Sequence, residues 1–147
     1  MPTIQLYSVR LVREGPLSYA PVTQPYEAQQ AIRALLHTLL HDRDREAAVA
    51  IALDARNRPI GAHVISIGTV SATLVHPREV FKFAILSNAH SLLFAHNHPS
   101  GDAEPSRDDI DLSRRLKKAG QLIGIDLIDS LITGHESFIS LKERQLI

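Results

Sequence analysis

The chain has 147 residues, of which 44% are hydrophobic and 22% charged, and its sixteen basic side chains balance sixteen acidic ones. This composition is typical of a single globular domain, and the charge balance provides no general positive field that would favour nucleic acid as a partner. The absence of cysteine excludes disulfides, thiolate zinc sites, iron–sulfur clusters and thiol nucleophiles. Any transition-metal site must therefore be built from carboxylates and from the eight histidines.

The first residues lack the basic and apolar regions of a signal peptide. The longest apolar run, residues 47–53, is far shorter than the roughly 20 residues that a membrane-spanning helix needs. We therefore expect a cytoplasmic protein that makes no membrane contact.

Hydrophobic patterning predicts the elements in chain order. Residues 4–12 are rich in β-forming side chains and predict a strand, and residues 28–41 carry the apolar stripe of an amphipathic helix. The further predicted elements are a hairpin of strands 47–53 and 60–67, a helix over 78–88 opened by Pro77, a strand over 91–96, a helix from Ser106 to the terminating Gly120, and strands over 122–133 and 137–141. This order indicates an α/β fold with one mixed sheet and flanking helices. We expect an N-terminal strand and extension over 1–26 and the metal-binding domain over 27–147.

One stretch concentrates residues that can bind a metal. His96 and His98 stand two positions apart at the end of a predicted strand, so both imidazoles can face one point. Ser106 opens the next helix, and Asp109 follows in its first turn at the spacing of a capping box. Two imidazoles, one carboxylate and an open position for water are the donor set of a catalytic zinc site. The sequence therefore predicts one catalytic Zn²⁺ held by His96, His98 and Asp109.

The spacing His-x-His, seven residues, Ser, two residues, Asp resembles the JAMM motif of the JAB/MPN-type metalloproteases. The segments TVSATLVHPREVF, AHNHPSGDAEPSRDD and AGQLIGIDLID are similar to those of the RadC-like branch of that superfamily. The likeness covers residues 27–147 and is most specific over 65–110. It implies a cytidine-deaminase-like α/β fold and a zinc-dependent hydrolase of amide or isopeptide bonds. It also implies that zinc and a glutamate from an earlier element activate a water, with Ser106 as a helper.

Two glutamates are candidates for that role. In proteins of this kind the glutamate precedes the first apolar core strand, and Glu46 stands immediately before residues 47–53. Glu79 is the competitor, because it would lie one turn into a helix, but the family pattern favours Glu46. A carboxylate is needed because zinc acidifies water without itself carrying the proton to the leaving amine. Ser106 can hydrogen-bond the developing oxyanion, cap its helix, or do both.

The sequence departs from the family it resembles in two places. Full-length RadC-like proteins usually carry an N-terminal helix-hairpin-helix region, and we expect the DNA association of that region to be missing here. The family commonly has Asp-His where this chain has Asp129 and Ser130. We expect a peptide or protein substrate rather than nucleic acid. The alternatives are a metal-dependent nuclease or DNA-repair accessory protein, and a non-catalytic JAB/MPN-like binding module.

Overall fold

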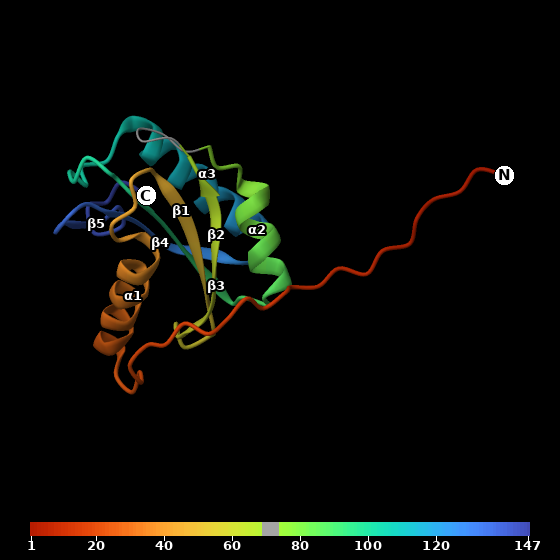
Figure 1. The fold of residues 1–147 in the computed structure, drawn as a ribbon, viewed down its shortest axis with the longest axis horizontal. Helices are drawn as coiled ribbons and strands as arrows, with labels where there is room; N and C mark the ends of the chain where they lie inside the picture. Colours follow the sequence, from red (N-terminus) through yellow and green to blue (C-terminus); the bar gives the residue numbers. More distant parts are fainter. Residues whose placement is uncertain (69–73) are drawn as a thin grey trace.

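The computed structural model describes residues 1–68 and 74–147, so the first part of the segment TVSATLVHPREVF lies outside the described residues. The described chain forms a mixed α/β domain of one five-stranded sheet with helices on both faces (Figure 1). Its elements are α1 (Pro25–Leu40), β1 (Ala47–Leu53), β2 (Pro59–Ile67), α2 (Pro77–Leu86), β3 (Ser91–Asn97), α3 (Arg107–Ile123), β4 (Asp126–Thr133) and β5 (Phe138–Ser140). No helix in the described part of the chain is both long and apolar enough to cross a membrane.

The strands lie in the order β2-β1-β3-β4-β5. β1 pairs antiparallel with both β2 and β3, whereas β3 and β4 run parallel and are connected through α3. A parallel pair requires such a crossover, because the chain must return to the end of the sheet where the first strand began. The crossover begins at the C-terminal end of β3, so the start of α3 lies beside His96 and His98.

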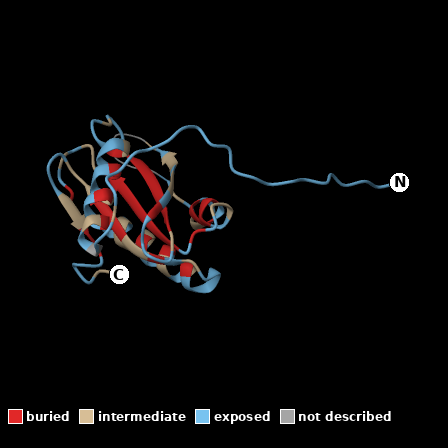
Figure 2. Cartoon of the chain, turned by 90° about the horizontal axis from the view of Figure 1, so that it is seen from below, coloured by how far each residue is buried: buried red, intermediate tan, exposed pale blue. Residues whose placement is uncertain are grey.

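The two central strands alternate between two cores. Ala48, Ala50 and Ala52 of β1 pack with Leu92 and Phe94 of β3 in the core that also contains residues of α2 and α3. The odd-numbered residues of β1 pack with Leu93 and Ala95 of β3 and with α1 on the opposite face. All seven residues of each strand are buried, as the red strands of Figure 2 show. Both faces of β1 are therefore covered.

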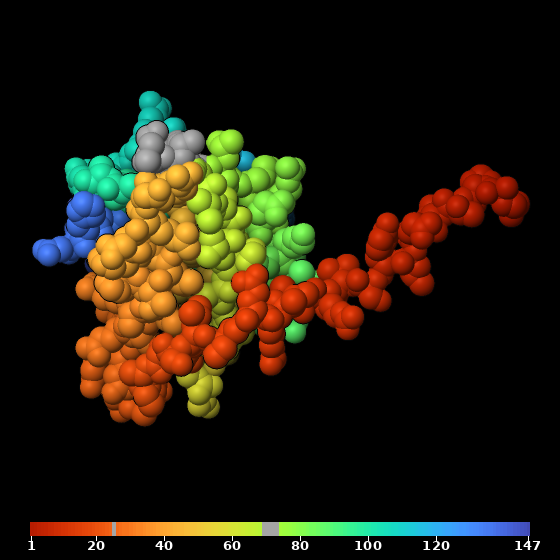
Figure 3. All heavy atoms as spheres, viewed as in Figure 1, coloured from red at the N-terminus to blue at the C-terminus, as the bar shows by residue number. Residues whose placement is uncertain are grey.

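The predicted strand over residues 4–12 is wrong. The segment is extended and exposed, with Ile4 96% and Leu6 100% accessible, and it runs away from the domain (Figures 1 and 3). β-forming side chains stabilise a strand only when a neighbouring strand and a buried face complete it, and the described residues supply neither. Closer to the domain, Tyr19 donates a hydrogen bond from its hydroxyl to the carbonyl oxygen of Pro59, 2.8 Å away.

The end of α3 also differs from the prediction. The terminating glycine is Gly124, which has φ +88° and whose N–H bonds to the Gly120 carbonyl oxygen, so the helix runs one turn further than expected. Gly120 instead lies buried inside the helix, where a Cβ atom would come within 2.5 Å of the Ile125 carbonyl oxygen. Both positions require glycine, Gly124 for its left-handed backbone and Gly120 for close packing of α3 against the chain that enters β4.

Candidate metal centre

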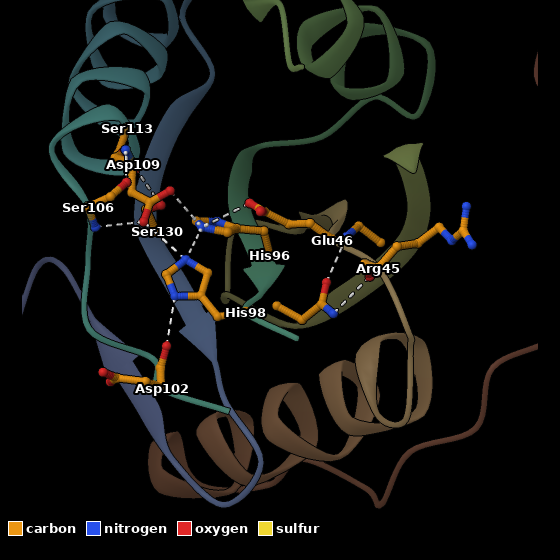
Figure 4. A network of polar contacts seen from close by, with 11 residues as sticks. Arg45, Glu46, His96, His98, Asp102, Ser106, Asp109, Ser113 and Ser130 are labelled. Carbon is orange, nitrogen blue, oxygen red and sulfur yellow. Dashed lines mark hydrogen bonds and ion pairs between the residues drawn. The ribbon is translucent and has the colours of Figure 1, made fainter. Parts of the chain in front are cut away.

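Four side chains that can bind a metal meet at the end of the sheet covered by α3 (Figure 4). Glu46 directly precedes β1, and the strand alternation places it on the same face as Ala48. His96 lies on the corresponding face of β3, opposite Ala48 in the pairing register. His98 follows β3, and Asp109 lies in the first turn of α3. Residues distant in sequence thus converge because two strand ends and one helix start share one corner.

The four ligand atoms lie within 4.8 Å of one another. The Nε2 atoms of His96 and His98 are 3.2 Å apart. The Asp109 carboxylate places Oδ1 at 3.0 Å from His96 Nε2 and Oδ2 at 3.1 Å from His98 Nε2. Glu46 stands slightly further out, with Oε1 at 3.8 Å from His96 Nε2. Three groups therefore form a tight triangle, and the Glu46 carboxylate faces it.

These separations fit a small tetrahedral metal ion. Ligand bonds of about 2.0–2.1 Å, as zinc makes to nitrogen and oxygen, put neighbouring donors of a tetrahedron about 3.3 Å apart. The distances of 3.0–3.2 Å among His96, His98 and Asp109 are close to that edge length. The donor set, two imidazoles and a carboxylate, also suits zinc. This cluster could therefore bind a metal ion.

Neighbouring groups set the orientation of His98. Its Nδ1 donates a hydrogen bond to the carbonyl oxygen of Asp102, 2.9 Å away, so in the neutral ring Nε2 carries the lone pair that faces the cluster. Across the cluster, His96 Nδ1 is buried, and among the described residues it has no hydrogen-bond partner. The loop between β3 and α3 thus orients His98 through its Nδ1, whereas in the described part of the chain the polar contacts of His96 are made by its Nε2 alone.

The carboxylate of Asp109 is held by the start of α3. Ser106 and Asp109 form the predicted capping box, with Ser106 N donating to Asp109 Oδ2 at 2.8 Å. One turn along, the buried Ser113 hydroxyl donates to the Asp109 carbonyl oxygen at 2.8 Å. Ser130 of β4 lies 2.7 Å from the Ser113 hydroxyl, which links this turn to the sheet. Side-chain hydrogen bonds therefore fix both the carboxylate and the backbone of Asp109.

The charges of the site follow from burial and close contact. Burial raises the pKa of Glu46, and the nearby His96 and His98 only partly offset that effect. The hydrogen bond to Asp109 raises the pKa of His98 despite the opposing effect of burial. Burial alone would raise the pKa of Asp109, but the hydrogen bonds from both histidines outweigh it and hold that pKa well below its usual range. Close contact with the histidines thus favours the ionised form of Asp109, whereas burial makes Glu46 easier to protonate than an exposed glutamate.

The structure separates the two glutamates that the sequence left in competition. Glu46 is buried at the cluster, with 8% of its surface exposed. Glu79 lies in the first turn of α2, where its side chain is 56% exposed and pairs with Arg78 at 3.9 Å. Position therefore favours Glu46 as the carboxylate facing the predicted ligands.

Sequence reasoning overlooked three supporting groups: the Asp102 carbonyl, the Ser113–Ser130 pair, and Asn97, which bonds the backbone on both sides of Glu46. Every residue has a backbone carbonyl, so the sequence could not indicate that the carbonyl of Asp102 accepts a hydrogen bond from His98. The two serines have no sequence signal of partnership, because they are seventeen positions apart. Asn97 did carry a signal, since an amide between two candidate ligands in a buried strand needs hydrogen-bond partners.

Comparison with known proteins places this chain in a family. The model of the RadC-like JAB domain matches residues 26–146. A UPF0758 protein of Desulforamulus reducens is 50% identical over 108 residues, which are 74% of this chain and 48% of that protein. A UPF0758 protein of Desulfitobacterium hafniense is 39% identical over 138 residues, 94% of this chain and 59% of that protein. A UPF0758 protein of Methanosarcina acetivorans is 40% identical over 116 residues, 79% of this chain and 51% of that protein.

The chain belongs to the RadC-like JAB domain family. This confirms the resemblance drawn from the motif, and the mixed sheet with three helices confirms the predicted α/β fold class. The chain spans about half the length of the curated relatives it matches.

Proposed function

We propose that this protein is a zinc-dependent hydrolase of amide or isopeptide bonds in a peptide or protein substrate, with its centre at Glu46, His96, His98 and Asp109. The observation that carries the proposal is the convergence of these four groups at one partly buried corner. His96, His98 and Asp109 would hold the metal, and a bound zinc ion supplies Lewis-acid chemistry by acidifying water and polarising a carbonyl. Membership of the JAB family supports the same reading.

Glu46 is the proton carrier in this proposal. Its carboxylate faces the ligand triangle but stands further from His96 than Asp109 does, at 3.8 Å against 3.0 Å. It can accept a proton from the attacking water and deliver it to the leaving nitrogen. Burial raises its pKa, which improves the carboxylate as a base and keeps the acid available for the second transfer.

Ser106 can serve the oxyanion as well as the helix. Its Oγ accepts a hydrogen bond from Asp109 N at 3.1 Å, which uses a lone pair and leaves the hydroxyl hydrogen free to donate. The capping role and a contact to the developing negative charge are therefore compatible.

The experiment is a hydrolysis assay of zinc-loaded protein against panels of model peptides and isopeptide-linked substrates, with supercoiled plasmid and oligonucleotides in parallel. We expect cleavage of an amide bond that Asp109→Ala abolishes, and DNA binding that is at most weak and salt-sensitive. Cleavage of DNA that depends on Asp109 would replace the peptidase proposal by the nuclease alternative. Stoichiometric zinc without hydrolysis of any substrate would favour the non-catalytic module.

A further inference from the structure

Asn97 makes two hydrogen bonds that bracket Glu46. Its Oδ1 accepts from the backbone N–H of Ala47 at 2.7 Å, and its Nδ2 donates to the carbonyl oxygen of Arg45 at 3.1 Å. These two backbone groups stand immediately after and immediately before Glu46. Asn97 is 5% exposed, so both of its amide atoms are satisfied inside the protein. Figure 4 shows Arg45 beside Glu46, whose carboxylate points toward His96.

The Asn97 side chain supplies a hydrogen bond at the point where the backbone pairing between β1 and β3 ends. The register between β1 and β3 ends at Ala48 opposite His96, two residues after Glu46. Beyond that point β3 stays paired with β4 on its other edge, and His98 N bonds to the Thr133 carbonyl oxygen. Ala47 N–H therefore finds its partner in the Asn97 side chain. On the other flank, Gly68 N donates to the Glu46 carbonyl oxygen at 2.7 Å. The backbone at Glu46 is thus fixed from both neighbouring strands.

Asn97 acts from the face opposite the metal ligands. Strand alternation puts it on the same side of β3 as Leu93 and Ala95, which pack in the core beneath α1. His96 lies on the other face, toward α3. Asn97 hydrogen-bonds backbone groups beside Glu46, so its influence on the site passes through the position of that residue.

We propose that Asn97 is a positioning residue that holds the Glu46 carboxylate against the metal centre. The inference rests on the proposed function for its catalytic consequence, because a misplaced proton carrier matters only in a site that moves protons. Without the amide, the backbone around Glu46 would be held from the β2 side alone, next to the charged turn of residues 41–45. A displacement of about 1 Å at a reacting group is enough to cost about 100-fold in rate.

The first test measures backbone protection by amide hydrogen exchange in wild type and Asn97→Ala, without any substrate. We expect the Ala47 amide to exchange at least about tenfold faster in the variant, while the Val49 and Ile51 amides keep their protection. A crystal structure of the zinc-loaded variant should show the Glu46 carboxylate displaced, with His96, His98 and Asp109 unmoved. An unchanged Ala47 amide, an unmoved carboxylate or loss of zinc in this variant would overturn the proposal.

The second test is a double-mutant cycle on turnover. Asn97→Ala should lower kcat by about 10–100-fold in the wild-type background and by less than about twofold in the Glu46→Gln background, because its effect passes through Glu46. Equal losses in both backgrounds would show general damage and contradict a positioning role. Ser140→Ala is the matched control, because it also removes a side-chain hydrogen bond of a buried residue, the one from Ser140 of β5 to Asp129 of β4. This variant should keep kcat within about twofold.

The two tests separate this inference from the proposed function. If wild type hydrolyses none of the substrates, the hydrolase proposal fails. The exchange rate of the Ala47 amide and the position of the Glu46 carboxylate in the variant still decide whether Asn97 holds Glu46 in place. If Asn97→Ala is too unstable to study, Asn97→Asp retains an acceptor for Ala47 N–H and lacks the donor to the Arg45 carbonyl. That variant should protect the Ala47 amide better than alanine does, and equal exchange in the two would overturn the assigned contact.

Discussion

Ser106 and Asp109 hydrogen-bond each other in both directions. Asp109 N donates to Ser106 Oγ at 3.1 Å, and Ser106 N donates to Asp109 Oδ2 at 2.8 Å. The same Oδ2 lies 3.1 Å from His98 Nε2. A helix cap is thereby also the support of a predicted metal ligand, so the folding of α3 and the preparation of the site are coupled.

Ser106→Ala should therefore affect stability and metal binding together. We expect the free energy of unfolding to fall by about 1 kcal/mol, the usual cost of losing a serine cap. Zinc affinity should fall about tenfold, as is usual when a group that orients a ligand is removed. Thermal unfolding and competition with a zinc chelator measure the two effects. Ser106→Thr keeps the capping oxygen and should restore both; a drop in stability with unchanged affinity would contradict the coupling.

The choice between the two glutamates gives a second prediction. Glu46→Gln should retain zinc and the fold, because Glu46 is not one of the three proposed ligands, but it should lose roughly 10²–10⁴-fold in turnover. Glu79→Gln is the matched control, since Glu79 is exposed and pairs with Arg78. Both variants are compared on the same substrate at equal zinc loading. A dead Glu79→Gln beside an active Glu46→Gln would show that the wrong carboxylate has been assigned.

Alanine at either of the two glycines near the end of α3 should lower the free energy of unfolding, for a different reason at each position. Gly120→Ala puts a methyl group 2.5 Å from the Ile125 carbonyl oxygen, which is backbone and cannot move aside cheaply. We expect it to lower the free energy of unfolding by about 1–3 kcal/mol, as overpacking does in a core. Gly124→Ala enters open space and bears only the strain of φ +88°, about 1–2 kcal/mol. Chemical denaturation measures both, and a loss below about 1 kcal/mol in Gly120→Ala would contradict this packing.

Asp54 organises the turn between β1 and β2 and gives a prediction about pH. Hydrogen bonds from the backbone N–H groups of Arg58 and then Arg56, together with the Arg58 side chain, lower the pKa of Asp54. A carboxyl with a lowered folded-state pKa stabilises the protein above its unfolded value, about 3.9, and loses that contribution as the pH falls through the folded value.

Asp54→Asn, which mimics the protonated group, should therefore melt below wild type at pH 7, and the difference in Tm should shrink below about pH 4. Glu136→Gln is a suitable control, because it removes one negative charge from an exposed loop residue. A difference between wild type and Asp54→Asn that stays constant from pH 7 to pH 3 would contradict a stabilising role for the ionised carboxylate.

Most elements of the domain could be predicted because their patterns are local. The all-apolar run 47–53 became the central strand β1, and the stripe that begins at Ala28 became the buried face of α1. Pro77 opened α2, and Ser106 capped α3, because each fits the first turn of a helix for a local steric or hydrogen-bonding reason. The predicted strand 4–12 failed because a strand depends on a partner that local propensity does not reveal.

The residues of the site can likewise be separated into those that local sequence indicates and those that depend on the folded sheet. The spacing of His96, His98 and Asp109 indicated a metal cluster, since two short intervals place all three on adjoining pieces of one strand–loop–helix unit. The contacts of Asn97 with the residues flanking Glu46 span fifty and fifty-two positions. They depend on the register of β1 against β3, which only the folded sheet defines.

Zinc content measured by elemental analysis on tag-free wild type, Glu46→Gln and His98→Ala tests the central claim most directly. The proposed centre predicts about one zinc per chain in wild type and in Glu46→Gln, and close to none in His98→Ala, because His98 is a proposed ligand and Glu46 is not. All three proteins should be folded by circular dichroism. Zinc retained in full by His98→Ala, or absent from folded wild type after incubation with the metal, would contradict the assignment.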